Sequence, residues 1–111
     1  TIGSPHGGTW LARFGVTPNG LQMRRANDWL KELQQAELRR QPQGPYARFT
    51  CLYSHCDNIV FPPSTATLPG ADNRHVPGSA HVHLAFQPEV FSEVWRRVSV
   101  PAVSARALAA Q

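Results

Sequence analysis

The chain has 111 residues, of which 41% are apolar, and it carries a net charge of +4. This length accommodates one small domain with a hydrophobic core and excludes a two-domain organisation. No stretch is long and apolar enough to form a transmembrane helix. Ten prolines and eight glycines predict short elements separated by frequent turns.

The charge pattern is dominated by paired arginines. Their wide separation, without an aromatic-rich RNA-binding motif, favours solvated helix faces over a nucleic-acid surface. We therefore expect no nucleic-acid partner, whereas contact with a membrane or an anionic lipid surface stays open. The two cysteines suit either a pair of thiols or one short-loop bridge, and the apolar run around Cys51 favours burial there. The pairs are Arg24-Arg25, Arg39-Arg40 and Arg96-Arg97.

The chain is expected to begin in the end of a strand at residues 1–3, so we expect Thr1 to continue from earlier sequence. Proline and paired glycines at residues 4–8 then predict a loop. A short helix is expected over residues 10–14, followed by a second loop over residues 15–20. No compartment is predicted from these features.

The clearest helix is predicted over residues 27–40, with Asn27 or Asp28 as its N-cap and two arginines in its last turn. Apolar residues recur there at helical spacing, which predicts one buried stripe. The stripe consists of Ala26, Trp29, Leu30, Leu33 and Ala36.

The following segment, residues 46–54, is rich in aromatic and β-prone residues, which predicts a buried strand. Residues 55–58 form a loop before a short apolar plug. A loop over residues 64–73 leads to a short strand at residues 74–76. A final helix begins after Pro88 and is expected to bury Val90, Phe91, Val94 and Val98, with Trp95 beside them.

This order of strands alternating with helices predicts an α/β fold with parallel strands and flanking helices. The folded unit is expected over residues 1–99. Residues 100–111 are rich in alanine and are expected to form a loose or frayed tail.

Two ionisable residues follow predicted strands directly. In an open parallel sheet, functional groups gather beyond the carboxyl ends of the strands. Asp57 follows the first strand and His81 follows the second, an order that suits nucleophilic catalysis by an acid–base pair. Taken singly, Asp57 is also typical of a turn residue, and His81 of a loop histidine bonded to backbone.

Three segments resemble bacterial lipases and esterases of the α/β-hydrolase fold. Thr-Ile-Gly-Ser-Pro-His-Gly-Gly-Thr at residues 1–9 is similar to their Gly-Thr-Pro-His-x-Gly-Thr segment. Tyr-Ser-His-Cys-Asp-Asn-Ile-Val at residues 53–60 resembles their Tyr-Ser-x-x-Asp-x-Ile-Val segment. Pro-Gly-Ser-Ala-His-Val-His-Leu at residues 77–84 resembles their Gly-x-x-His-x-x-Leu segment. The acid precedes the base, as this fold requires.

The resemblance implies that this chain is the C-terminal half of a carboxylic ester hydrolase acting on an ester or lipid, without a cofactor. It assigns Asp57 as the acid and His81 as the base of a catalytic triad, with His83 as the competing base. His6 is expected to shape the loop after the first strand. Trp10, Phe14, Phe61 and Phe86 are acyl-pocket candidates, although core packing is the favoured interpretation for each.

One departure from the family pattern is decisive for activity. The family nucleophile is a serine in a Gly-x-Ser-x-Gly turn, and no such pentapeptide occurs in this sequence. The serine and both oxyanion-hole donors are therefore expected upstream of Thr1, and the 111 residues by themselves are expected to be inactive.

Two other interpretations stay open. Histidines and cysteines at residues 51–83 supply potential zinc ligands, but their spacing fits a zinc knuckle poorly, and no metal is expected. The second is a non-catalytic interaction module derived from a hydrolase fold.

Overall fold

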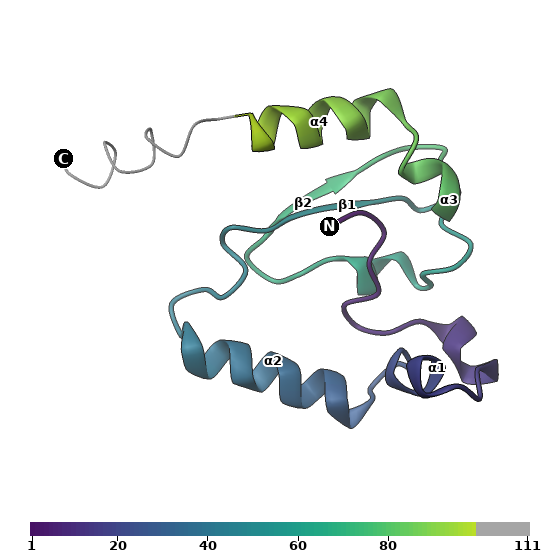
Figure 1. Cartoon of the computed structure of the whole chain (residues 1–111), viewed down its shortest axis with the longest axis vertical. Coiled ribbons are helices and arrows are strands. Elements are labelled where there is room, and N and C mark those ends of the chain that lie inside the picture. Colours follow the sequence, from purple (N-terminus) through teal and green to yellow (C-terminus); the bar gives the residue numbers. More distant parts are fainter. Residues whose placement is uncertain (100–111) are drawn as a thin grey trace.

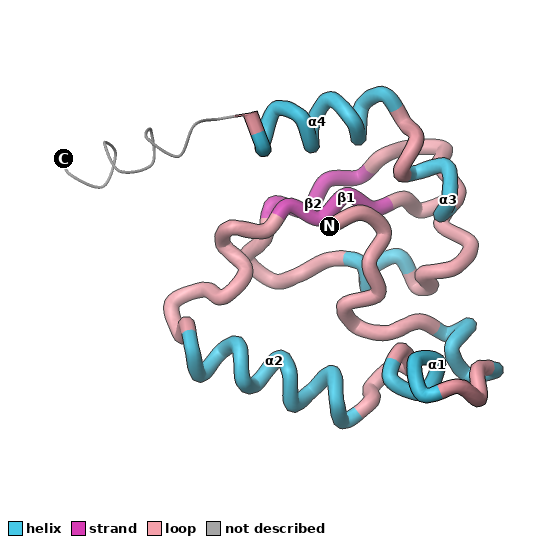
Figure 2. The backbone as a smooth tube through the Cα atoms, in the orientation of Figure 1, coloured by secondary structure: helices cyan, strands magenta, loops and turns pink. Residues whose placement is uncertain are grey.

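The computed structural model describes residues 1–99, so the tail expected at 100–111 lies outside the described residues. It is a small mixed domain of helices around parallel strands (Figures 1 and 2). No helix within residues 1–99 is long and apolar enough to cross a membrane. The elements in chain order are η1 (Trp10–Phe14), α1 (Pro18–Gln22), α2 (Asp28–Arg40), β1 (Thr50–Tyr53), η2 (Pro63–Ala66), β2 (Asp72–His75), α3 (His81–Leu84) and α4 (Pro88–Val98).

The strands β1 and β2 pair in parallel, with Tyr53 opposite His75 at their carboxyl ends. The start of the chain lies along the other edge of β1 (Figure 2). There Ile2 forms a parallel bridge with Leu52, and the amide of Gly3 donates to the Leu52 carbonyl at 2.8 Å. The strand end expected at residues 1–3 is therefore confirmed as a parallel bridge.

Alternation along β1 sends successive side chains to opposite faces of the sheet. Leu52 packs with Val76, Leu84 and Val90, which come from the loop after β2, from α3 and from α4. Cys51 packs on the other face in a cluster with Tyr46 and Leu68. Figure 1 shows the corresponding arrangement, with α4 on one side of the strands and α2 on the other.

The predicted helix over residues 27–40 is confirmed as α2. The Asn27 side chain caps it by accepting from the Trp29 amide at 2.7 Å, and Arg39 and Arg40 lie in its last turn. The predicted burial of its apolar stripe is wrong: no residue of α2 is buried, and Trp29 is 48% exposed. The apolar periodicity identified the helix correctly. Its apolar face is not covered, because an open pocket lies between part of α2 and the loops at residues 4–7 and 64–69.

The final helix is confirmed as α4, but its predicted inner face is wrong in part. Only Val90 is buried, whereas Phe91, Val94 and Val98 are exposed together with Trp95. The sheet beneath α4 is too narrow to cover the whole apolar stripe.

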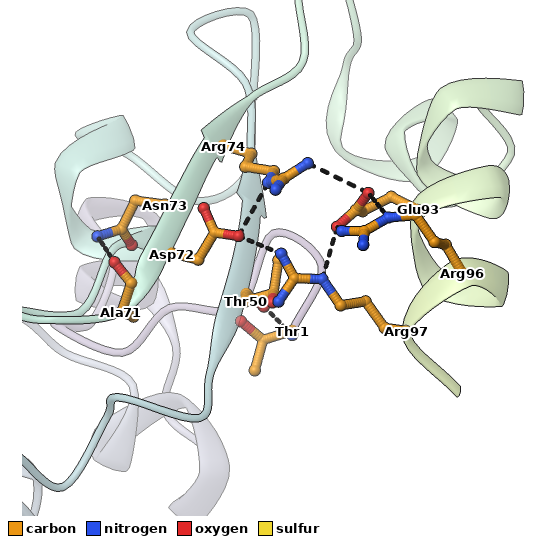
Figure 3. A network of polar contacts seen from close by, with 9 residues as sticks. All are labelled: Thr1, Thr50, Ala71, Asp72, Asn73, Arg74, Glu93, Arg96 and Arg97. Carbon is orange, nitrogen blue, oxygen red and sulfur yellow. Dashed lines mark hydrogen bonds and ion pairs between the residues drawn. The ribbon is translucent and has the colours of Figure 1, made fainter. Parts of the chain in front are cut away.

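Charged side chains join α4 to the edge strand β2 (Figure 3). Glu93 accepts from Arg96 and Arg97, each at 2.7 Å, and forms an ion pair with Arg74 at 3.1 Å. Arg97 also reaches Asp72. Hydrogen bonds from Arg96 and Arg97 lower the pKa of Glu93 from its ordinary 4.5 to about 2. The pair at 96–97 is thus engaged in ion pairs rather than freely solvated.

Several predicted boundaries need correction. The strand expected over residues 46–54 is limited to β1, because residues 45–48 form a turn instead. The strand expected at residues 74–76 is β2, which begins two residues earlier. The loops expected over 15–20 and 64–73 overlap α1 and η2, each of which has a proline in its first turn. His81 begins the short helix α3 rather than lying in a loop.

Candidate active site

The parallel pairing brings two loops to the same edge of the sheet. Asp57 lies four residues after the end of β1, and His81 lies six residues after the end of β2. Because the strands run in the same direction, both loops leave at their common carboxyl end. The fold thus brings together two residues that are separated by 24 positions in the sequence.

Asp57 is held by its own loop. Its Oδ1 atom accepts hydrogen bonds from the backbone amides of Ile59 and Val60, both at 2.8 Å. The side chain is only 2% exposed. A buried carboxylate requires hydrogen-bond donors, and the backbone amides of the turn that follows Asp57 supply them. The second oxygen, Oδ2, is left free for another partner.

That partner is His81. Its Nδ1 atom lies 2.9 Å from Asp57 Oδ2, so the expected contact between these two side chains is confirmed. A carboxylate only accepts, so Nδ1 carries the proton and Nε2 of the neutral ring keeps its lone pair. The His81 backbone amide also donates to Asn58 Oδ1 at 3.3 Å, which fixes the start of α3 against the acid's loop.

Gly3 packs closely against the Asp57–His81 pair. It adopts a φ of +52°, and a Cβ there would lie 3.2 Å from His81 Nδ1 and 3.3 Å from Asp57 Oδ2. A residue with a side chain would therefore press on both members of the pair. The bridge between Ile2 and Leu52 brings this glycine into position.

The Nε2 atom of His81 makes no hydrogen bond with residues 1–99. The His81 side chain is 28% exposed. Such a ring is arranged to accept a proton at Nε2 while the buried carboxylate stabilises the resulting imidazolium.

Comparison with protein-family models, curated proteins and solved structures finds no match to this chain. The likeness to bacterial lipases and esterases therefore rests on the three segments described above. Each of these segments contributes to the arrangement around the pair: Gly3 from the first, Asp57 from the second and His81 from the third.

The other histidines are placed differently. His83 is exposed on α3 and does not contact Asp57, so the acid faces His81 rather than the competing base. His6 Nε2 lies 3.0 Å from Thr1 Oγ1 and 4.0 Å from Cys51 Sγ, away from the pair. Burial lowers the pKa of His6.

The residues considered for zinc do not gather into one site. Among residues 1–99, no group of three or more histidine, cysteine, aspartate or glutamate side chains is arranged to hold a metal. His55 and His75 instead stack beside the strand ends, with ring centroids 4.2 Å apart. Cys51 and Cys56 are free thiols, the first buried and the second exposed.

An apolar pocket of about 310 Å³ borders the acid's loop. Trp10 and Phe61 meet there edge to face, with ring centroids 6.5 Å apart. The expectation that the aromatic candidates pack in the core is wrong: Trp10, Phe14, Phe61 and Phe86 are all at least 50% exposed. The pocket is lined by Trp10, Leu11, Arg13, Phe14, Asp57, Asn58 and Phe61.

The roles of two supporting residues were not predicted from the sequence. Thr9 is buried, donates its hydroxyl to the Ile59 carbonyl and accepts from the Phe61 amide at 3.2 Å, which secures the loop after Asp57. The Asn58 side-chain oxygen accepts a hydrogen bond from the His81 amide. Both belong to segments quoted for the resemblance, but their partners are distant in sequence. Only the neighbouring Asp-Asn pair gave a local signal, and it indicated a turn.

Proposed function

We propose that this chain is the C-terminal part of an α/β-hydrolase-fold carboxylic ester hydrolase, similar to lipases, with Asp57 as the acid and His81 as the base. The observation that carries the proposal is the 2.9 Å contact between His81 Nδ1 and the buried Asp57 carboxylate at the ends of adjacent parallel strands. Their order in the chain and the quoted segments support it.

In the proposed reaction, a serine from sequence outside these 111 residues attacks the ester carbonyl. His81 Nε2 takes the hydroxyl proton, and the new bond between serine and carbonyl carbon gives a tetrahedral intermediate. His81 then returns this proton to the leaving alcohol as the ester C–O bond breaks. Water, deprotonated by the same nitrogen, releases the acid and restores the serine. Asp57 holds the ring tautomer and stabilises the imidazolium.

The test uses the reading frame extended upstream of Thr1 and measures hydrolysis of a short-chain p-nitrophenyl ester. We expect a Gly-x-Ser-x-Gly turn in that extension, and a loss of kcat on the order of 10⁶-fold in His81→Ala. His83→Ala is the matched control, because His83 is exposed two residues further along α3 and does not contact Asp57. Full turnover in His81→Ala, or equal losses in both variants, would overturn the assignment.

The non-catalytic interaction module has its own supporting observation. Large apolar side chains are exposed on two helices, including Trp29 and Leu33 on α2 and Phe91 and Trp95 on α4. Exposed patches of this kind mark binding surfaces. An extended protein that lacks the serine turn and hydrolyses no ester would favour this second function.

A further inference from the structure

Two further histidines lie together at the carboxyl ends of the strands, outside the Asp57–His81 pair. His75 is the last residue of β2, and His55 lies two residues after the end of β1. Their rings stack at a tilt of 34°, with centroids 4.2 Å apart. Tyr53, opposite His75 in the sheet, has its ring centroid 5.6 Å from that of His75 and 5.8 Å from that of His55. The proposed reaction uses neither of these histidines.

A hydrogen bond between the two residues fixes the charge state of His75. The His55 backbone amide donates to His75 Nε2 at 3.3 Å. An imidazole nitrogen accepts a hydrogen bond only when it carries no proton, so His75 is neutral here and keeps its proton on Nδ1. The bond joins the turn after β1 to the end of β2, and it exists in only one charge state of His75.

The turn that contains His55 leads directly to the proposed acid. The Asp57 amide donates to the Ser54 carbonyl at 3.3 Å, which closes a turn with His55 inside it. Asp57 Oδ1 then accepts from the amides of Ile59 and Val60. The attachment of His55 to β2 therefore helps to position the carboxylate that holds His81.

The far end of the same loop is attached in a different way. There the Thr9 hydroxyl donates to the Ile59 carbonyl and accepts from the Phe61 amide at 3.2 Å. A threonine hydroxyl keeps the same charge between pH 5 and 8, whereas histidine ordinarily changes its charge in this range. The loop is thus held at its end by contacts that do not depend on pH and at its start by a contact that titrates.

No acidic side chain within residues 1–99 compensates a charge on the His55–His75 pair, because no salt bridge there involves either residue. The Asp57 carboxylate is engaged by His81 and by backbone amides. The Arg74 side chain forms its ion pairs within β2 and with α4 (Figure 3). The other titratable neighbours are the phenol of Tyr53 and the exposed thiol of Cys56. Two protonated rings would therefore repel each other without a counter-ion.

We propose that the His55–His75 pair is a pH-sensitive contact that holds the Asp57 loop when the pair is neutral and releases it on acidification. When His75 takes up a proton from solvent, its Nε2 becomes a donor and no longer accepts from the His55 amide. With both rings charged, repulsion opposes their stacking as well. The inference rests on the proposed function in one respect, since the released loop carries the proposed acid. The contact itself needs no catalysis, so its failure is distinguishable from a failure of turnover.

Hydrogen exchange of the 111-residue chain tests the proposal at about pH 7.5 and about pH 5.5, on either side of the ordinary histidine range. The Ile59 and Val60 amides report on the loop, because both donate to Asp57. Their protection factors are corrected for the intrinsic effect of pH on exchange. We expect these factors to fall on the order of fivefold at the lower pH, as for the loss of one hydrogen bond. Protonation of His81 strengthens its contact with Asp57, so it cannot produce this fall.

Three variants separate the pair from other effects of acid. His75→Gln keeps a neutral side-chain acceptor that does not titrate, so protection should be the same at both pH values. His75→Lys places a fixed charge without an acceptor at this position and should lower protection already at the higher pH. His83→Gln removes an exposed histidine outside the pair and should behave like the parent. Constant protection in the parent, or an equal fall in His75→Gln, would disprove the proposal.

Discussion

Replacing Gly3 with alanine tests whether the start of the chain positions the Asp57–His81 pair. The added Cβ would lie 3.2 Å from His81 Nδ1 and Cε1 and 3.3 Å from Asp57 Oδ2. Asp57 is fixed by two amides of its own loop, whereas the imidazole is 28% exposed. We therefore expect the histidine ring to turn outward and to lose its contact with the acid.

The expected magnitude separates into two parts, and Gly78 provides the matched control. Gly78 also has a left-handed φ, of +67°, but a Cβ there meets nothing within 4 Å. Alanine at either position costs about 1–2 kcal/mol of backbone strain. Loss of a charge-assisted hydrogen bond adds about 1.5–3 kcal/mol at Gly3 alone. The expected loss of unfolding free energy is therefore roughly 3–5 kcal/mol for Gly3→Ala and about 1–2 kcal/mol for Gly78→Ala.

Denaturant unfolding of both variants measures these losses, and NMR of the His81 ring nitrogens reports directly on the contact. We expect the Nδ1–H signal of His81 to change in Gly3→Ala and to persist in Gly78→Ala. Equal destabilisation in the two variants, together with an unchanged His81 spectrum in both, would refute the reasoning that Gly3 supports the pair.

Three further changes follow from the same contacts. Asp57→Asn keeps an oxygen for the two backbone amides of its loop but presents an NH₂ group to His81. The ring proton of His81 should therefore move from Nδ1 to Nε2, which ¹⁵N NMR of the ring detects. An unchanged tautomer would contradict the assigned geometry. Thr9→Val removes a buried hydroxyl that donates to the Ile59 carbonyl, and it should lower the unfolding free energy by about 1–3 kcal/mol. Thr9→Ser keeps the hydroxyl and should lower the unfolding free energy less. Identical losses in the two variants would show that the hydroxyl is unimportant. Because the pKa of Glu93 falls from 4.5 to about 2 on folding, its carboxylate stabilises the folded state above pH 4.5, and this contribution is lost as the pH falls towards 2. In Glu93→Gln, the melting temperature should depend less on pH over that range than in the parent protein. A melting temperature that falls with pH as steeply as in the parent would exclude a role for this ion-pair network.

The sequence predicted elements best where the signal is local. Asn27 as a cap, apolar periodicity and paired arginines at the end identified α2 almost to the residue, and Pro88 marked the start of α4. Short strands were less well bounded. Tyr46 and Phe49 are β-prone, but residues 45–48 form a turn, so only Thr50–Tyr53 pairs with β2 as a strand.

Burial was predicted less well than secondary structure, for a physical reason. Helical spacing shows which side chains share a face, whereas burial depends on what covers that face. Most of the large apolar residues of α2 and α4 are exposed within the described chain, because the two short strands bury little beyond Val90 and Leu84.

The sequence by itself determined the residue types of the candidate site and their order, an acid after one strand and a histidine after the next. It also distinguished His81 from His83 through its place in the quoted segment. Only the tertiary structure decided that Asp57 and His81 lie 2.9 Å apart, because this depends on parallel pairing between β1 and β2. The roles of Gly3 and Thr9 likewise depend on the fold, since each acts on residues 50 or more positions away in sequence, where no local pattern connects them.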